Sequence, residues 1–509
     1  MLDPRLHRID STRVRIDNPH GVEAMLFANE EVPVESAAVD ELSTMLDLEA
    51  TARAFAEHSP ECFDREPEVL RVAVTPDFHK ARGIPVGTVL ATKGFSVPQA
   101  IGNDVNCGMR LHVTSVAPDQ ITSRLDDLET AFRHLYFEGG RNIPMSRGQR
   151  ESLLTRGLEG LFDATPRTSA EGLWSLVHEL DMGRELERVD RRGSLPAGPA
   201  TAFEDWLGPA DRVSRDSQIG SIGGGNHFVE IQRVDRIIDG ATAHAWGLKR
   251  GAVTIMVHTG SVSLGHASGM RGRDAVQATH PASLPHPDNG IFILPHGPRH
   301  REAATRVHNA LNHAANFAFA NRMFLAVMAV AGLRRVFGDV DASLLYDAPH
   351  NFLWREEIDG EEVTIHRKGA CPARGYDAMA GTPFAFTGEP VLVPGSMGAS
   401  SFILAGRGLA EGLSSASHGA GRTLSRGAAL KGHEAEFEEF MRRFRVVTPI
   451  DLRRPDVRSR RDILERKLDE IRQEAPYAYK GIGPVVQTLT EAGLASPVAE
   501  LTPLMTIKG

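Results

Sequence analysis

The sequence is poor in cysteine and lysine. Three cysteines in 509 residues, Cys62, Cys107 and Cys371, are too few for a disulfide framework in a chain of this length. Free thiols and metal ligands are therefore the two interpretations of these cysteines, and both fit a reducing compartment. Only eight of the 57 basic residues are lysines. Arginine suits bidentate contacts with phosphate, but a GC-rich genome produces the same bias.

Long apolar runs are also missing. No stretch approaches the ~20 apolar residues that span a bilayer, and the opening MLDPRLHRID lacks the apolar core of a signal peptide. We therefore expect a cytoplasmic protein without a membrane partner. The net charge of −9 argues against a protein that coats nucleic acid by bulk charge, although a local basic groove is compatible with it.

The sequence contains no Walker-type phosphate cradle. No lysine is followed by serine or threonine, so GxxxxGK[ST] does not occur. Glycine-rich turns are present instead, in SIGGGN, GSMGASS and SHGAGR. Glycines let backbone N–H groups approach an anion closely, although each such turn alone is more often a simple turn.

The predicted secondary structure changes several times along the chain. RVAVTPDFH predicts a strand that ends at Asp77 and His79, and GIPVGTVLATKG predicts a second strand. A charged helical pattern occupies about 116–210, and we interpret it as an insertion. Strand-like, glycine-rich sequence then runs to about 430, interrupted by one helix that starts at REAATRVHNALNH. Residues 432–473 are again predicted to be helical.

Candidate metal ligands gather where predicted strands end. SIGGGNHF, AVTIMVHTGS, LLYDAPHNF and SASHGAGR place four histidines at such points: His227, His258, His350 and His418. Each alone is more often a structural histidine. Together with the carboxylate and thiol of IGNDVNCGMR, they offer the donors that hold zinc or manganese in an open catalytic site.

Cys107 lies three residues after Asp104 and could bridge two ions, because one sulfur has lone pairs for both. The alternative is a small buried apolar residue, which is common for cysteine. Cys62 and Cys371 fit that alternative.

Eight motifs, in order, resemble those of the RNA-splicing ligase RtcB family over roughly residues 20–490. They are TPDFH, IGNDVNCGMR, SIGGGNHFVEI, VHTGS, HRKGA, VPGSMGASSFIL, SHGAGRTLSR and EAPYAYK. The resemblance implies an enzyme that uses GTP and two manganese ions per chain to join an RNA 3′-phosphate or 2′,3′-cyclic phosphate to a 5′-hydroxyl. It also implies one α+β catalytic domain over 1–509, with mixed sheets around a di-metal centre, and it allows an activating partner of the archease type.

The resemblance implies a role for each matched residue. The ligands of the two ions would be Asp104, Cys107, His227, His258 and His350, with Cys107 as the bridge. His418 would be the nucleophile that takes GMP. The guanylate contacts would be Asn226, Glu230, Ser396, Ser401, Ala420, Gly421 and Lys480. Arg422 and Arg426, expected one helical turn apart, would hold RNA phosphates.

The chain also departs from the family pattern. HTGSVSLGH has Val262 where the family usually has an arginine, HKARGIPVG replaces HPGYGFPIG, and no aromatic near 440–450 is identified to stack on guanine. The nucleic-acid acceptor is therefore open. The alternatives are an enzyme that caps 3′-phosphate ends of DNA or RNA, a two-metal phosphoesterase, and a catalytically silent RNA-binding relative.

Overall fold

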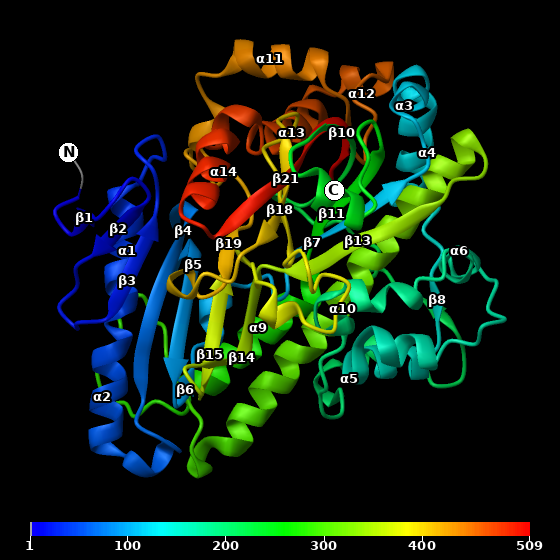
Figure 1. Ribbon diagram of the computed structural model, residues 1–509. Coiled ribbons are helices and arrows are strands. Elements are labelled where there is room, and N and C mark those ends of the chain that lie inside the picture. Colours follow the sequence, from blue (N-terminus) through cyan, green and yellow to red (C-terminus); the bar gives the residue numbers. More distant parts are fainter. Residues whose placement is uncertain (1–2) are drawn as a thin grey trace.

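The computed structural model describes residues 3–509 and contains two large mixed sheets (Figure 1). The first sheet has seven strands in the order β1 (Leu6–Arg8), β2 (Arg13–Ile16), β3 (Glu23–Phe27), β4 (Glu68–Arg82), β5 (Ile84–Lys93), β15 (Glu361–Lys368) and β14 (Asn351–Ile358). Only β3 and β4 pair in parallel. Helices α1 (Ser36–Leu46) and α2 (Leu48–His58) contact β4, and their apolar faces share one core with this sheet.

The second sheet carries most of the predicted ligands. Its order is β13 (Ala342–Pro349), β7 (Gly108–Thr114), β11 (Val253–Thr259), β10 (Phe228–Ile237), β21 (Ala495–Ile507), β18 (Ser401–Gly406) and β17 (Pro390–Val393), with β20 (Val446–Val447) parallel to β21. The strands come from nearly the whole length of the chain. The prediction of an α+β fold with mixed sheets is confirmed.

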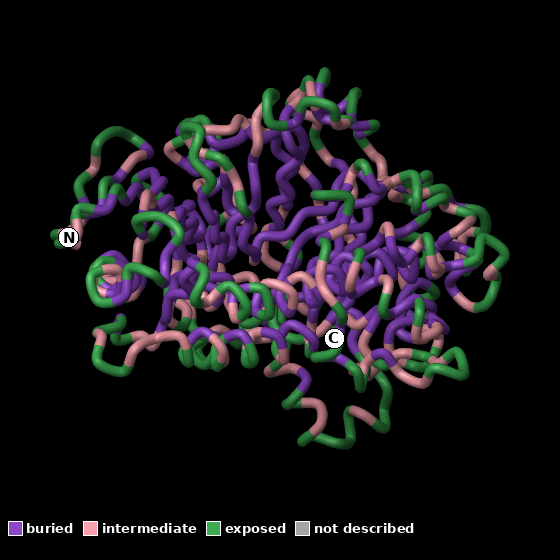
Figure 2. Tube along the Cα trace, turned by 90° about the horizontal axis from the view of Figure 1, so that it is seen from below, coloured by how far each residue is buried: buried purple, intermediate pink, exposed green. Residues whose placement is uncertain are grey.

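A 37-residue helix, α10 (Arg301–Phe337), contacts the second sheet through β11, β7 and β10. The stretch Pro298–Phe337 is long and apolar enough to cross a membrane, but 94% of its most apolar window is buried inside the protein. Such burial is typical of a core helix. Figure 2 shows the same pattern for the whole chain, with buried backbone in the interior and exposed backbone at the rim.

Further helices pack around α10 or line the rim. Those in contact with α10 include α4 (Leu125–Phe137), α5 (Arg147–Asp163), α6 (Trp174–Glu179) and α9 (Val262–Gln277). The other α-helices are α3 (Pro118–Ser123), α7 (Glu204–Leu207), α8 (Gly240–Ala245), α11 (Glu434–Arg443), α12 (Pro455–Ser459), α13 (Arg461–Arg472) and α14 (Ile482–Glu491). The segment predicted as an insertion, about 116–210, is largely helical, and its apolar side chains share a core with α10.

Three separate two-stranded antiparallel sheets are also present: β6 (Phe95–Ser96) with β12 (Leu294–Pro295), β8 (Pro144–Met145) with β9 (Ser214–Arg215), and β16 (Ala370–Pro372) with β19 (Ser415–Ser417). The last pair matters most for the site, because β19 leads directly into His418.

Candidate metal centre and active site

The register of the second sheet brings the predicted ligands to one edge. His258, near the end of β11, lies opposite Phe228 at the start of β10 and opposite Met109 in β7. Pro349, at the end of β13, lies opposite Gly108. Antiparallel neighbours place the end of one strand beside the start of the next. The residues just outside these strands therefore meet, although they are far apart in sequence.

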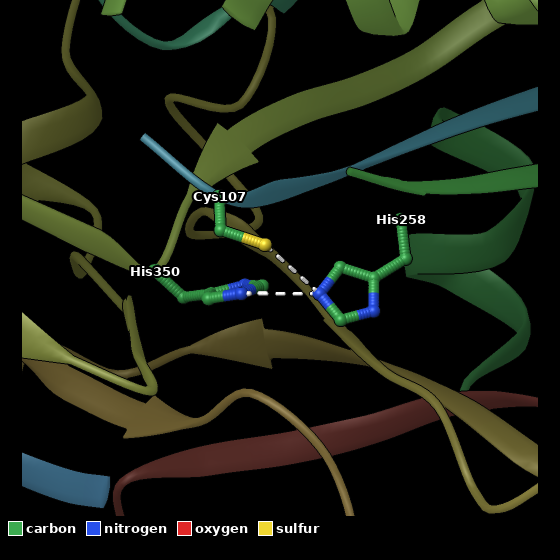
Figure 3. A group of neighbouring side chains, drawn as sticks. All are labelled: Cys107, His258 and His350. Atoms are coloured by element: carbon green, nitrogen blue, oxygen red, sulfur yellow. Dashed lines mark hydrogen bonds between the residues drawn. The ribbon is translucent and has the colours of Figure 1, made fainter. Parts of the chain in front are cut away.

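The five predicted ligands form two groups that share Cys107. One group is Cys107, His258 and His350, and the other is Asp104, Cys107 and His227; within each group the donor atoms lie within 4.8 Å of one another. The Cys107 Sγ lies 3.2 Å from His258 Nε2 and 3.3 Å from His227 Nε2. Figure 3 shows Cys107 and His350 both directed at the Nε2 of His258. The geometry fits a thiolate bridging two ions.

The donor set itself indicates a cation. His258 Nε2 and His350 Nε2 face each other at 3.3 Å, and two neutral imidazole lone pairs repel at that distance unless a proton or a metal lies between them. The buried Oδ1 of Asp104 has no hydrogen-bond partner among residues 3–509. Burial lowers the pKa of both His258 and His350, which keeps these imidazoles neutral and able to bind a metal.

Cys107 needs a metal to become a thiolate. Burial, reinforced by the neighbouring Asp104 carboxylate, raises the pKa of the Cys107 thiol well above its usual value. Two divalent ions would reverse that effect, because a coordinating thiol is deprotonated outright. The residues present therefore fit the two-metal centre that the resemblance implies.

A buried arginine positions the loop that carries Cys107. Arg322, in the middle of α10, donates to the backbone oxygen of Asn106 at 2.7 Å and to Asp347 Oδ1 at 2.8 Å. Asn106 has a left-handed backbone with φ of 58°, which asparagine tolerates better than most residues. The role of Arg322 could not be predicted from the sequence, because nothing in an apolar helix pattern indicates which way one arginine points.

His418 lies beside the metal ligands and is oriented by Asp77. Its ring centroid lies 4.6 Å from that of His350, and its Nδ1 lies 2.6 Å from Asp77 Oδ2. A carboxylate only accepts hydrogen bonds, so Nδ1 carries the proton and Nε2 keeps a free lone pair. Burial alone would raise the pKa of Asp77, but the hydrogen bonds from His418 and Thr75, together with the charge of His418, outweigh it and leave the pKa below its usual value.

An irregularity in β4 turns Asp77 toward His418. The predicted strand end at Asp77 and His79 is wrong, because β4 continues to Arg82. However, the register with β5 shifts between Val74 and His79, and Asp77 lies in this irregular part. Bulges re-aim side chains and are frequent next to active sites. The motif TPDFH pointed to this segment but not to the role of Asp77.

The two histidine groups and His418 open into one cavity of about 690 Å³. The predicted nucleotide contacts that line it are Asn226, Ser396, Ala420 and Gly421. Glu230 and Ser401 do not line it. Both are buried behind it and are joined by Gln232, whose Nε2 donates to Glu230 Oε1 at 2.7 Å and to Ser401 Oγ at 3.0 Å.

Lys480 does not reach the cavity. Its Nζ donates to the backbone oxygens of Phe78 at 2.6 Å and Pro76 at 3.2 Å, on either side of Asp77. The structure instead places Lys508 in the cavity wall, with its Nζ bonded to the oxygen of Gly225. Burial lowers the pKa of Lys508 to about 8. Nothing in the sequence indicated that Lys508 lines the cavity, apart from the small number of lysines in the chain.

The two arginines predicted to hold RNA line the cavity but are not on a helix. Residues 421–427 form bends and turns, so the expected helical spacing is wrong. Glu474 accepts from Arg422 Nη1 at 2.9 Å and from Arg426 Nε at 3.0 Å. One carboxylate therefore offsets part of the charge of both arginines. Arg426 remains the more exposed of the two.

Two aromatic rings that the sequence analysis did not single out lie near the loop of Ser396. Phe440 and Phe444 pack against Gly398, and neither lines the cavity. Val262, in the arginine position of the family pattern, has a left-handed backbone with φ of 42°. That conformation is uncommon for a β-branched residue.

Comparison with known proteins agrees with this geometry. A family model described as "tRNA-splicing ligase RtcB" matches residues 64–509. The chain belongs to the RtcB family. The tRNA-splicing ligase RtcB of Thermococcus kodakarensis is 32% identical over 462 residues, which cover 86% of this chain and 87% of the relative.

A bacterial RtcB protein gives the same result. The RNA-splicing ligase RtcB of Mycobacterium bovis is 33% identical over 469 residues, which cover 87% of this chain and 98% of the relative. The tRNA-splicing ligase RtcB of Methanococcus maripaludis is 29% identical over 454 residues. The family match over residues 64–509 therefore includes the metal centre, the second sheet and the strands β4, β5, β14 and β15 of the first sheet.

Proposed function

We propose that this protein is an RNA ligase that uses GTP and two manganese ions to join a 3′-phosphate or 2′,3′-cyclic phosphate end to a 5′-hydroxyl. One observation carries the proposal. Two ligand groups share Cys107, and His418 lies beside them with a free Nε2. Family membership and the names of the relatives support RNA as the substrate.

The metal ions would be held by Asp104, Cys107 and His227 on one side and by Cys107, His258 and His350 on the other. When bound, they would offset the negative charge that gathers on the phosphoryl oxygens during transfer, which is worth several kcal/mol. Imidazole, thiolate and carboxylate together accept manganese, zinc or cobalt. The choice of manganese rests on the family resemblance.

His418 would act as the nucleophile. Asp77 holds Nδ1–H, so the Nε2 lone pair attacks the α-phosphorus of GTP, the N–P bond forms, and pyrophosphate leaves. An oxygen of the RNA 3′-phosphate then attacks the same phosphorus, and His418 leaves as a neutral imidazole. The 5′-hydroxyl of the second RNA end finally attacks the activated 3′-phosphate; the new P–O bond forms, the bond to GMP breaks, and the hydroxyl proton passes to water. A 2′,3′-cyclic phosphate end would first be opened by water to the 3′-phosphate.

The nucleotide would be bound by the wall of the same cavity. Asn226, Ala420 and Gly421 line it near His418, and Lys508 adds a positive charge from the end of β21. The buried carboxyl of Glu230 lies behind this wall, where it could accept hydrogen bonds from the guanine edge after small movements. We place Lys508, in preference to Lys480, among the guanylate contacts because Lys480 is engaged with the backbone around Asp77.

The test is covalent labelling with α-³²P-GTP and Mn²⁺. A ligase of this kind should form a protein–GMP adduct that is acid-labile and alkali-stable, as phosphoramidates are. His418→Ala should bind metal but form no adduct. It should nevertheless seal RNA that already carries a 3′-pp-G end, because this step no longer requires the nucleophile.

The same experiment separates the alternatives. A two-metal phosphoesterase would cleave phosphoesters without labelling His418. An end-capping enzyme would be labelled and would transfer GMP to a 3′-phosphate, but would not seal it to a supplied 5′-hydroxyl. Labelling followed by sealing of a 3′-phosphate RNA is the result expected here.

A further inference from the structure

A second cavity, of about 400 Å³, lies beside α9 and shares no lining residue with the active-site cavity. Its wall includes Arg150 from α5, Trp206 from α7, Arg215 from β9 and Arg271 from α9, together with Asp216 and Ser263. The volume is in the range of ligand pockets, about 300–1,000 Å³. Nothing in the proposed reaction at His418 uses these residues.

Helix α9 connects this cavity with the metal centre. Just before the helix, a Cβ atom on Gly260 would lie only 2.3 Å from Asp104 Oδ1, so the backbone there touches a metal ligand. Val262 begins the helix, Ser263 already lines the second cavity, and Arg271 follows nine residues after Val262. At about 1.5 Å per residue, Arg271 is roughly 13 Å further along the helix axis.

Two buried N–H donors at the cavity wall have no acceptor in residues 3–509, although the Nη atoms of Arg150 donate to Leu207 and Ser214. Arg150 is only 2% exposed, and its Nε has no hydrogen-bond partner in the described part of the chain; the nearest carboxylate oxygen, on Asp216, is 3.8 Å away. The Nε1 of Trp206 is also buried without a partner there. Buried donors of this kind are costly unless a ligand accepts from them.

The exposed arginines add positive charge. Arg215 is exposed and forms no ion pair within residues 3–509. Arg271 is held at the wall by a hydrogen bond to the oxygen of Ala202 and lies 5.5 Å from the ring centroid of Phe203. Three guanidinium groups face two carboxylates, Asp205 and Asp216. A phosphodiester with a base attached supplies both the negative charge and the acceptor atoms that this wall lacks.

We propose that this cavity binds a nucleotide of the RNA substrate, away from the reacting end. The inference rests on the proposed function, because it takes RNA as the substrate. It also accounts for Val262. The positive charge that is missing at the start of α9 is supplied by Arg271 further along the same helix and by Arg215 of β9. The RNA strand therefore crosses Val262 and is held by these two arginines.

The test is RNA binding by the double variant Arg215→Ala/Arg271→Ala in the presence of Mn²⁺. Fluorescence anisotropy should show about a tenfold loss of affinity for a 3′-phosphorylated 12-mer. The slope of log affinity against log salt should shrink by about 0.7 for each RNA phosphate that the variant no longer neutralises. A 3′-phosphorylated dinucleotide, at about 3.4 Å per stacked nucleotide, is shorter than the roughly 13 Å along α9 from Val262 to Arg271 and should bind both proteins equally.

Two controls keep the outcomes distinct. Arg53→Ala removes an exposed arginine on α2 and should leave binding of the 12-mer unchanged. Labelling with GTP should be the same in the double variant and the wild type, because no altered residue lines the active-site cavity. Arg215→Ala alone should show part of the effect, and it removes no intramolecular ion pair.

Two results would overturn the inference. The first is equal binding of the 12-mer by the double variant and the wild type. The second is an equal loss for the dinucleotide and the 12-mer, which would indicate a general defect. If the wild type itself forms no GMP adduct, the proposed function fails, and this is a separate measurement from RNA binding.

Discussion

The metal centre and the cavity beside α9 are built in different ways. At the metal centre, the polar atoms face one another at 2.7–3.3 Å and come from the ends of adjacent strands of one sheet. At the cavity beside α9, helices and loops contribute guanidinium and indole groups, and two of their buried donors, Arg150 Nε and Trp206 Nε1, have no partner in residues 3–509. The donors of the first region are arranged around each other, whereas the second region exposes arginines at the surface.

This difference separates chemistry from substrate choice. Moving one metal ligand requires a change of strand register, which would turn a whole strand over. Changing an exposed arginine such as Arg215 or Arg271 disturbs little of the packing around it, because surface substitutions usually change stability by no more than about 0.5 kcal/mol. We therefore expect the guanylylation chemistry to be fixed by the sheet, and the choice of RNA to be set by residues such as Val262, Arg215 and Arg271.

The largest effect should come from Cys107→Ala. This change removes the one ligand common to both groups, so metal content should fall and the GMP adduct should disappear. Elemental analysis of the purified protein and GTP labelling measure both. Cys62→Ala, at another buried cysteine outside the site, is the matched control and should retain both properties. Wild-type metal content in Cys107→Ala would disprove the bridge.

Asp77→Asn should slow adduct formation without removing the ions. The amide cannot stabilise the imidazole as a carboxylate does, and comparable changes at a histidine partner cost on the order of 10²–10⁴ in rate. The rate of labelling at saturating GTP and the metal content are to be measured together. A labelling rate equal to that of the wild type would show that Asp77 does not orient His418.

Glu230→Gln should make the protein more stable at high pH. Burial raises the pKa of Glu230 to about 7 from an ordinary value of 4.5. The stabilisation linked to its proton is therefore complete below about pH 4.5 and is lost as the pH rises through about 7. At pH 8 the variant should gain at most about 3 kcal/mol of unfolding free energy relative to wild type. Chemical denaturation at pH 5 and pH 8 checks this, and a gain no larger at pH 8 would contradict it.

The smallest effect should come from Val262→Arg. A guanidinium at the start of α9 would add one solvent-exposed contact with RNA phosphate, worth about 1 kcal/mol or roughly fivefold in affinity at low salt. Val262→Ala controls for the loss of the valine side chain. If the arginine variant binds RNA no better than the alanine variant, the RNA strand does not pass over the start of α9.

The structure brings the predicted ligands together, and their role as metal ligands stays a prediction. His258 and His350 sit at strand ends that apolar runs indicate, and antiparallel pairing brings them beside Cys107, which the motif IGNDVNCGMR pointed to. Helix α10 was also predicted, since its apolar pattern is long and unbroken. These features depend on the spacing of apolar residues along the chain, which a single sequence is enough to show.

Other features depend on tertiary contacts that no local pattern reveals. Asp77 is directed at His418 by an irregularity in β4 that the strand pattern does not indicate. Lys480 and Lys508 are both near the site in space, but only the direction of each side chain decides which one lines the cavity. The turn after His418 was expected to be helical because Arg422 and Arg426 are four residues apart, whereas glycine at 421 takes a left-handed φ of 76° and begins a turn.

The two ligand groups differ in how far solvent reaches them. Cys107, His258 and His350 are all buried, whereas Asp104 is partly exposed. Both groups open into the active-site cavity, but an ion held by Cys107, His258 and His350 would have only buried ligands and would exchange more slowly than an ion beside Asp104. A chelator should therefore strip the two ions in two phases, the one beside Asp104 first. The metal held by Cys107, His258 and His350 would then be the ion that was abundant when the chain folded. Later changes in the metal content of the cell would alter mainly the ion beside Asp104.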